Sequence, residues 1–86
     1  MSEELISFPT EFPIKIMGRQ APDFVQMVRA IVEAEAGPVD DSSVVSRDSR
    51  DGNFVAVTIT FTATSRAQLD ALYEILSGHE RVLVVL

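Results

Sequence analysis

The sequence contains no cysteine. This absence excludes disulfide bonds, zinc sites built from thiolates and catalysis by a thiol. It also fits a reducing compartment, because proteins of oxidising compartments are the ones that keep disulfides. The single histidine, His79, makes a weak case for a metal without cysteine partners. We therefore expect no metal site and no thiol-dependent function.

Basic residues are also scarce. Seven Lys and Arg stand against thirteen Asp and Glu, which gives a net charge of −6. Binding to a phosphate backbone depends on clustered Lys and Arg, whereas these bases are scattered along the sequence, at Lys15, Arg19, Arg29, Arg47, Arg50, Arg66 and Arg81. We expect no basic patch, not even around Arg47 and Arg50, and no nucleic-acid partner.

No long apolar run is present either. The longest, Val82 to Leu86, is far shorter than the roughly 18 residues that suggest a membrane-spanning helix. The first residues, Met-Ser-Glu-Glu, lack the basic patch and the apolar stretch of a signal peptide. We therefore expect a cytoplasmic protein with no membrane partner.

What the chain does contain is an ordinary globular composition, with 47% hydrophobic and 23% charged residues in a length of 86. A chain of this size forms one domain. Residues 1–11 mix acids with Leu5, Ile6 and Phe8, and we interpret them as an irregular N-terminal arm. The single folded domain is expected over residues 12–86.

Alternation of apolar and polar residues predicts the two clearest strands. Residues 12–17 alternate, with Ile14 and Ile16 on one face, and Gly18 is expected to end this strand. Residues 54–63 alternate most regularly, with apolar side chains on one face and threonines on much of the other. A strand of this kind has one buried and one polar face.

Two further strands are predicted from weaker signals. Residues 44–50 begin with two valines, and the Asp51-Gly52-Asn53 sequence after them supplies the positive φ angle that a tight hairpin needs. Residues 82–86 are apolar on both faces and form the last strand.

Apolar residues at helical spacing predict two helices. The first runs over residues 22–36 and is stopped by Gly37. The second begins after Ser65, which has the capping-box spacing to Gln68, and it ends at Gly78.

The resulting order is β-α-β-β-α-β. Because each βα unit crosses over right-handed and is split by another strand, the sheet order is 4-1-3-2 with both helices on one face. This is the ferredoxin-like fold. The predicted core between the sheet and the helices consists of Ile14, Ile16, Phe24, Val28, Ile31, Val57, Ile59, Phe61, Leu69, Leu72 and Leu76.

Few residues point to chemistry. His79 follows the second predicted helix, where a solvated histidine suits the negative end of the helix dipole. Asp40, Asp41, Asp48 and Asp51 lack the alternating spacing and the closing Glu of a calcium loop, so we interpret them as a solvated acidic rim. On the third strand, Phe54 is the one aromatic placed for base stacking, which argues against RNA recognition. No catalytic residues are predicted.

The loop after the first strand is the one candidate for a ligand. Free backbone N–H groups and the helix dipole favour an anion at a helix N-terminus. Arg19 would add charge-assisted hydrogen bonds. The candidate ligand-binding residues are Gly18, Arg19 and Gln20, although we favour the alternative, a plain loop with an exposed Arg.

Several short motifs are ordered as in a known family. They are Phe8-Pro9-Thr10, Phe12-Pro13, Lys15, Met17-Gly18, Gly52-Asn53, Val57-Thr58-Ile59, Ala63-Thr64, Leu72-Tyr73 and the Val-Leu ending. As an ordered set, from about Leu5 to Leu86, they resemble the YbeD family of small bacterial proteins.

This resemblance implies a ferredoxin-like protein akin to ACT regulatory domains, which bind amino acids or similar effectors and pair through their sheets. It carries over no catalytic residues. Genes of the family can lie beside those for lipoyl transfer, so the resemblance also implies a link to lipoate metabolism. ACT ligand loops typically contain a Pro-Gly pair before the first helix, where this chain has Ala21-Pro22-Asp23.

Two functional classes follow. In the first, the chain is a non-enzymatic regulatory or adaptor module that assembles with itself or with another protein. In the second, it is an ACT-like effector-binding domain that holds a small anionic metabolite at the loop of Gly18, Arg19 and Gln20. We favour the first. No enzyme activity and no cofactor are expected, because no acid, base and nucleophile can be nominated together.

The last strand supports the assembly hypothesis. It is an edge in the order 4-1-3-2, yet it has no Lys, Pro or bulge to blunt it. Either the N-terminal arm or a second copy, in a homodimer, would cover the apolar side chains that it turns to the open face. The predicted interface residues are Val82, Leu83, Val84 and Val85.

Overall fold

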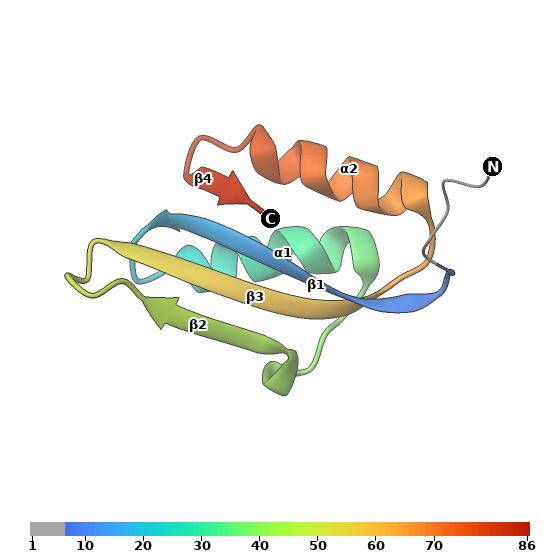
Figure 1. Cartoon of the computed structure of the whole chain (residues 1–86), viewed down its shortest axis with the longest axis horizontal. Coiled ribbons are helices and arrows are strands. Elements are labelled where there is room, and N and C mark those ends of the chain that lie inside the picture. Colours follow the sequence, from blue (N-terminus) through green and yellow to red (C-terminus); the bar gives the residue numbers. More distant parts are fainter. Residues whose placement is uncertain (1–6) are drawn as a thin grey trace.

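The computed structural model describes residues 7–86. It contains a four-stranded sheet with two helices packed on one face (Figure 1). Along the chain the elements are β1 (Thr10–Arg19), α1 (Phe24–Ala36), the short 3₁₀ helix η1 (Asp41–Ser43), β2 (Val44–Asp48), β3 (Phe54–Ala63), α2 (Arg66–Ser77) and β4 (Val82–Val85). This is the predicted order of strands and helices. Within the described range, neither α1 nor α2 has the length and apolar content that a membrane crossing requires.

The strands lie in the order β2-β3-β1-β4, and each is antiparallel to its neighbours. This confirms the predicted order, read from the opposite edge, and with it the ferredoxin-like fold. β1 and β3 pair along their whole length, from Thr10 opposite Ala63 to Arg19 opposite Phe54. β2 covers only part of β3, ending with Val44 opposite Ile59.

β1 is longer than the alternation predicted. It begins at Thr10, so residues 10 and 11 belong to the sheet and not to an irregular arm. It also continues through Gly18, which was expected to end it, because Gly18 is paired with β3 on one side and β4 on the other. Of the predicted arm, Phe8 packs against the core, whereas residues 1–6 lie outside the described residues.

The hairpin between β2 and β3 forms where the turn sequence predicted it. Gly52 has a φ angle of 79°, a conformation that side chains with a Cβ rarely adopt. The Asp51 carboxylate accepts hydrogen bonds from Ser49 Oγ at 2.9 Å and Asn53 N at 3.1 Å. β2 ends at Asp48, two residues earlier than predicted, because this turn already begins at Ser49.

Both helices are fixed at their ends by local hydrogen bonds. α1 begins at Phe24, two residues later than predicted, and its C-terminal N–H at Gly37 donates to Glu33 O. At the start of α2, Ser65 Oγ accepts from Gln68 N at 3.0 Å, as a capping box requires. Gln68 Oε1 accepts from Thr64 N at 2.8 Å instead of Ser65 N, so the box closes one residue earlier than its usual form.

One contiguous core fills the space between the sheet and the helices, and it contains ten of the eleven predicted residues. The exception is Ile31, which is only partly buried. On α1 the fully buried positions are Phe24, Val28 and Val32, because successive steps of four keep one narrow stripe on the sheet and turn position 31 away. Val55, Ala63 and Val82 complete the core.

Candidate functional site

The face of the sheet that the helices leave uncovered is one candidate surface. On β1 and β3 the buried side chains alternate with side chains that point to this open face. Across the four strands, one row of the open face consists of Arg47, Ala56, Met17 and Val84. A second row consists of Val45, Thr58, Lys15 and Leu86. The face therefore combines apolar residues from all four strands with basic residues from β1 and β2.

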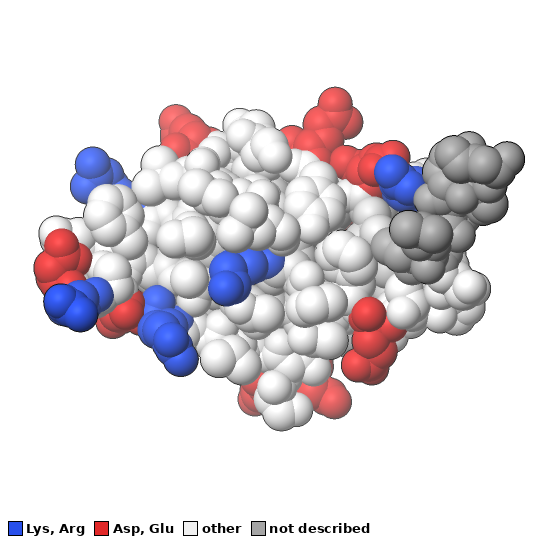
Figure 2. Space-filling view, in the orientation of Figure 1, with Lys and Arg blue, Asp and Glu red and all other residues white. Residues whose placement is uncertain are grey.

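The open face is hollowed where its side chains are small. A depression of about 230 Å³ has Lys15, Val45 and Arg47 around it, and Ala56 and Thr58 line it from β3. A smaller one, of about 130 Å³, adjoins it and shares Arg47 and Ala56. Figure 2 shows this side of the molecule: basic side chains lie in its middle and toward one end, while most acidic side chains lie along its outline.

The predicted interface strand β4 is an edge of the sheet and pairs only with β1. The prediction that this edge has no bulge was wrong: Leu83 is the extra residue of one, because Gly18 lies opposite Val82 and Met17 lies opposite Val84. Leu83 and Val84 are 55% and 40% exposed, as an interface requires. Val82, however, is buried beneath the helices, so it cannot contact a partner directly. Val85 is half-buried.

The predicted ligand residues Gly18, Arg19 and Gln20 lie together at the end of β1, but each already has a structural role. Gly18 is buried. The Arg19 guanidinium lies 5.7 Å from the centre of the Phe54 ring. Gln20 Nε2 donates to Asp48 Oδ1, and Gln20 N donates to Asn53 O at 2.9 Å. Arg19 is thus the one exposed cation that the loop offers to an anion.

The start of α1 is occupied by a carboxylate of the chain itself. Asp23 precedes the helix and accepts two hydrogen bonds from Arg81, at 2.8 and 3.1 Å. These bonds lower the pKa of Asp23. A hollow of about 240 Å³ remains beside this pair, between Arg19 and Gln20 on one side and Glu80, Arg81 and Leu83 on the other.

The remaining candidate residues hold loops in place. His79 Nδ1 accepts from Arg81 N at 3.1 Å, so this histidine orders the approach to β4 instead of standing free in solvent. Asp41 pairs with Arg29 at 2.8 Å. Asp51 caps the hairpin turn, where the Asn53 N–H and then the Ser49 hydroxyl lower its pKa. Within residues 7–86, no three His, Asp or Glu side chains lie close enough to hold a metal ion.

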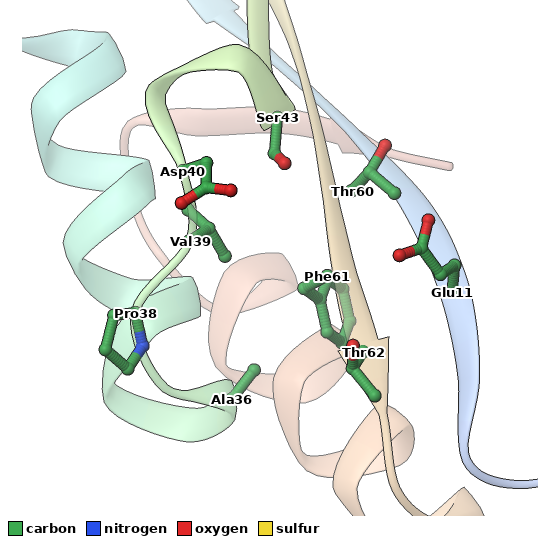
Figure 3. A pocket seen from close by; sticks show the side chains of 9 residues that line it. All are labelled: Glu11, Ala36, Pro38, Val39, Asp40, Ser43, Thr60, Phe61 and Thr62. Atoms are coloured by element: carbon green, nitrogen blue, oxygen red, sulfur yellow. The ribbon is translucent and has the colours of Figure 1, made fainter.

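A polar hollow of about 260 Å³ lies at the end of β3 that β2 does not reach. Its lining includes Asp40 from the α1–β2 connection and Glu11 from β1, which Figure 3 shows on opposite sides of β3. Ser43, Thr60 and Thr62 add hydroxyl groups. Within the described residues, no hydroxyl of this lining donates a hydrogen bond to the carboxylates of Asp40 or Glu11, so the hollow shows no nucleophile–base pair.

Sequence reasoning missed the basic character of the open face. Lys15, Arg19 and Arg47 lie far apart in the sequence and were expected to stay scattered. The sheet brings them to one face, because β3 lies between β1 and β2 and places Ala56 opposite both Met17 and Arg47. The signal was present in the alternation of β1, which assigns Lys15, Met17 and Arg19 to the side away from the core.

Comparison with known proteins identifies relatives over almost the whole chain. A family described as protein of unknown function, DUF493, matches residues 3–86. A UPF0250 protein of Bordetella parapertussis is 46% identical over 84 residues, which cover 98% of this chain and 92% of the relative. A UPF0250 protein of Paraburkholderia phytofirmans is 45% identical over 86 residues, which cover 100% of this chain and 97% of the relative.

A solved structure has the same architecture. The solution structure of protein HP0495 from H. pylori superposes with a TM-score of 0.72, covering 100% of this chain and 94% of that chain. The two sequences are 11% identical. At that identity the likeness shows a common fold and nothing about function.

Proposed function

Because this chain belongs to the DUF493 family of proteins of unknown function, we propose its role from its surface: it is a non-enzymatic regulatory or adaptor module that docks another protein on the open face of its sheet. The relatives, UPF0250 proteins of bacteria, confirm the resemblance to the YbeD family. They assign no activity, so the proposal depends on the structure.

The observation that carries the proposal is the exposure of large apolar side chains around the open face. Val45 is 62% exposed and Leu86 is 65% exposed, at opposite ends of one row across the sheet. Leu83, Val84 and Phe54 are exposed beside them. Single exposed apolar residues are normal, but a patch gathered on one face commonly marks a surface that contacts another protein.

The two edges of the sheet support the same assignment. β2 ends in Ser46, Arg47 and Asp48, and polar or charged residues of this kind discourage strand pairing. β4 consists of four apolar residues and pairs on one side only. Its short length limits free pairing, yet its side chains continue the apolar surface of the open face. A partner would therefore cover β4 together with that face.

Affinity capture of the full chain from its native cell tests the proposal. The test variant Val45→Gln/Val84→Gln makes two exposed positions polar without adding charge. The matched control, Ala30→Gln, changes an exposed residue of α1. We expect the wild-type chain and the control to retain one stoichiometric protein, and the test variant to lose it while melting at the same temperature. Equal retention by all three, or no retained protein, would contradict the proposal.

A second candidate function is favoured by the hollow next to Arg19. An effector with a carboxylate or phosphate group would fit beside Arg19 in this hollow and would receive charge-assisted hydrogen bonds from the Arg19 guanidinium. Titration with inorganic phosphate or acetate, followed by NMR, should then shift the amides of Gly18, Arg19 and Gln20. The shifts should disappear in Arg19→Ala. Shifts spread over the whole surface, or shifts that remain unchanged in Arg19→Ala, would indicate only nonspecific charge effects.

A further inference from the structure

Six of the seven basic residues of this chain fall into two environments, and the seventh, Arg50, is exposed in the hairpin turn. Those on the helices and before β4 are each paired with a carboxylate: Arg29, Arg66 and Arg81. Those on the open face form no ion pair with any residue of the described range: Lys15, Arg19 and Arg47. All three are exposed. In a protein of net charge −6, the unpaired positive charge is thus concentrated on the face that exposes apolar side chains (Figure 2).

Two of these bases border the larger depression of the open face. Lys15 and Arg47 lie beside Ala56 and Thr58, and Ala56 is opposite Met17 in the neighbouring strand. On this side of β3, Ala56 lies between Phe54 and Thr58 and is smaller than either. It therefore leaves room for an apolar side chain of another molecule. A carboxylate next to that side chain would meet cations from β1 and from β2.

We propose that the surface docked on this face is acidic: an apolar side chain lies over Ala56, flanked by Asp or Glu carboxylates that pair with Lys15 and Arg47. This inference rests on the proposed function and specifies the partner's chemistry. Complementary charge speeds association and excludes partners of the wrong sign. An acidic surface on a different protein is therefore the occupant that this face selects.

A second copy of the chain fits the same face poorly. A two-fold contact buries the same patch on both copies, so it would gather Lys15 and Arg47 of both copies in one interface. Like charges placed opposite each other oppose association. Docking the basic face on an acidic region elsewhere on a second copy would be a head-to-tail contact, which forms a closed ring only if its rotation closes and otherwise leads to open chains of molecules.

Nucleic acid is also a poor fit. Three bases are few for binding that depends on neutralising many phosphates. Base stacking needs an accessible aromatic ring, and the Arg19 guanidinium lies over Phe54, the aromatic residue exposed on this face. Val45 and Leu86 lie at the two ends of the row that contains Lys15. These apolar residues match a protein surface better than a phosphate backbone.

Photo-crosslinking in the native cell tests the charge of the partner. A benzophenone amino acid replaces Val84 in the full chain, and the yield of the protein adduct is measured. Three variants that carry this residue are compared with the otherwise wild-type chain that carries it. They are Lys15→Glu/Arg47→Glu, Lys15→Gln/Arg47→Gln, and the control Arg50→Glu in the hairpin turn. All are checked for an unchanged melting temperature.

We expect the charge reversal to lower the adduct yield about tenfold, the neutral pair to lower it less, and Arg50→Glu to leave it unchanged. Mass spectrometry should place the crosslink in a partner peptide rich in Asp and Glu. Equal yields in all versions would overturn this inference and leave the proposed function standing. A crosslink within a second copy, a nuclease-sensitive adduct, or no adduct at all would overturn both.

Discussion

At the residue scale, Gly18 shows how the absence of one side chain positions a whole edge of the sheet. A Cβ at this residue would lie 2.4 Å from Phe24 Cε1 and 2.5 Å from the carbonyl oxygen of Arg81. β1, α1 and the segment before β4 can therefore approach closely only around a glycine. Gly18 was predicted as a ligand residue, whereas its surroundings explain it through packing.

Gly18→Ala should therefore destabilise the fold by at least about 1–3 kcal/mol, the usual cost of overpacking. Backbone is one of the groups that would have to move, so a rotamer change cannot relieve the clash. Urea titration measures the loss, and Gly78→Ala serves as the control because its nearest contact would be 3.3 Å, to Glu74 O. Equal, small losses in both variants would contradict the account of Gly18.

A carboxylate at the end of α1 links stability to pH. Glu33 accepts from Val39 N at 2.9 Å and pairs with Arg29 at 3.3 Å. The Val39 N–H, and then Arg29, lower the pKa of Glu33. Because the folded pKa lies below the unfolded one, the stabilisation is fully present above the unfolded value, about 4.3, and is lost as the pH falls through the folded value.

Glu33→Gln should remove this part of the acid sensitivity. The variant is expected to be less stable than wild type at neutral pH, and the difference should shrink as the pH falls from about 5 to about 3. Urea midpoints across that range provide the measurement, with Glu35→Gln, an exposed carboxylate of the same helix, as the control. A difference that stays constant with pH would show that the Glu33 charge contributes nothing.

At the element scale, β3 organises the molecule, because it pairs with both β1 and β2 and supplies five buried side chains. Ile59 lies at its centre, opposite Ile14 on one side and Val44 on the other, and is fully buried. Ile59→Ala should cost about 2–5 kcal/mol, as other large-to-small core changes do. In urea titration, a loss below about 1 kcal/mol would contradict the assigned inward face.

The start of α2 joins the two helices through one side chain. Gln68 N donates to Ser65 Oγ, and Gln68 Nε2 donates to Glu35 O of α1 at 3.2 Å. Ser65→Ala leaves the Gln68 N–H without its cap and should cost about 0.5–2 kcal/mol. Ser65→Asp, which can still cap, should retain most of the stability. If thermal or urea unfolding found the alanine variant as stable as the aspartate variant, the cap would be irrelevant.

The elements with long, regular patterns were predicted best. The ten-residue alternation of β3 predicted both of its ends correctly, and the turn sequence at Gly52 predicted the strand that pairs with it. The end of β1 was misjudged because Gly18 was interpreted locally, as a stop. Its real cause is the approach of Phe24 and Arg81, which come from elsewhere in the sequence and cannot be recognised until the strands are placed.

At the scale of the whole molecule, the predicted surface differs from the observed one for the same reason: contacts between distant segments were not foreseen. The edge position of β4 followed from topology alone, so its exposure was anticipated. The burial of Val82 and the outward bulge at Leu83 depend on the local register against β1, which alternation could not give. The gathering of Lys15 and Arg47 depends on the registers of β1 and β2 against β3, which place these scattered charges on one basic face.

The central claim is that a protein partner covers the open face and β4. Amide hydrogen exchange, compared between the free chain and the complex captured from the native cell, tests it most directly. The account predicts that amide exchange slows in β4, an uncovered edge of the sheet. The amides on the exposed side of α1 should exchange at the same rate as in the free chain. Protection confined to α1 or α2, with β4 exchanging as fast as in the free chain, would contradict it.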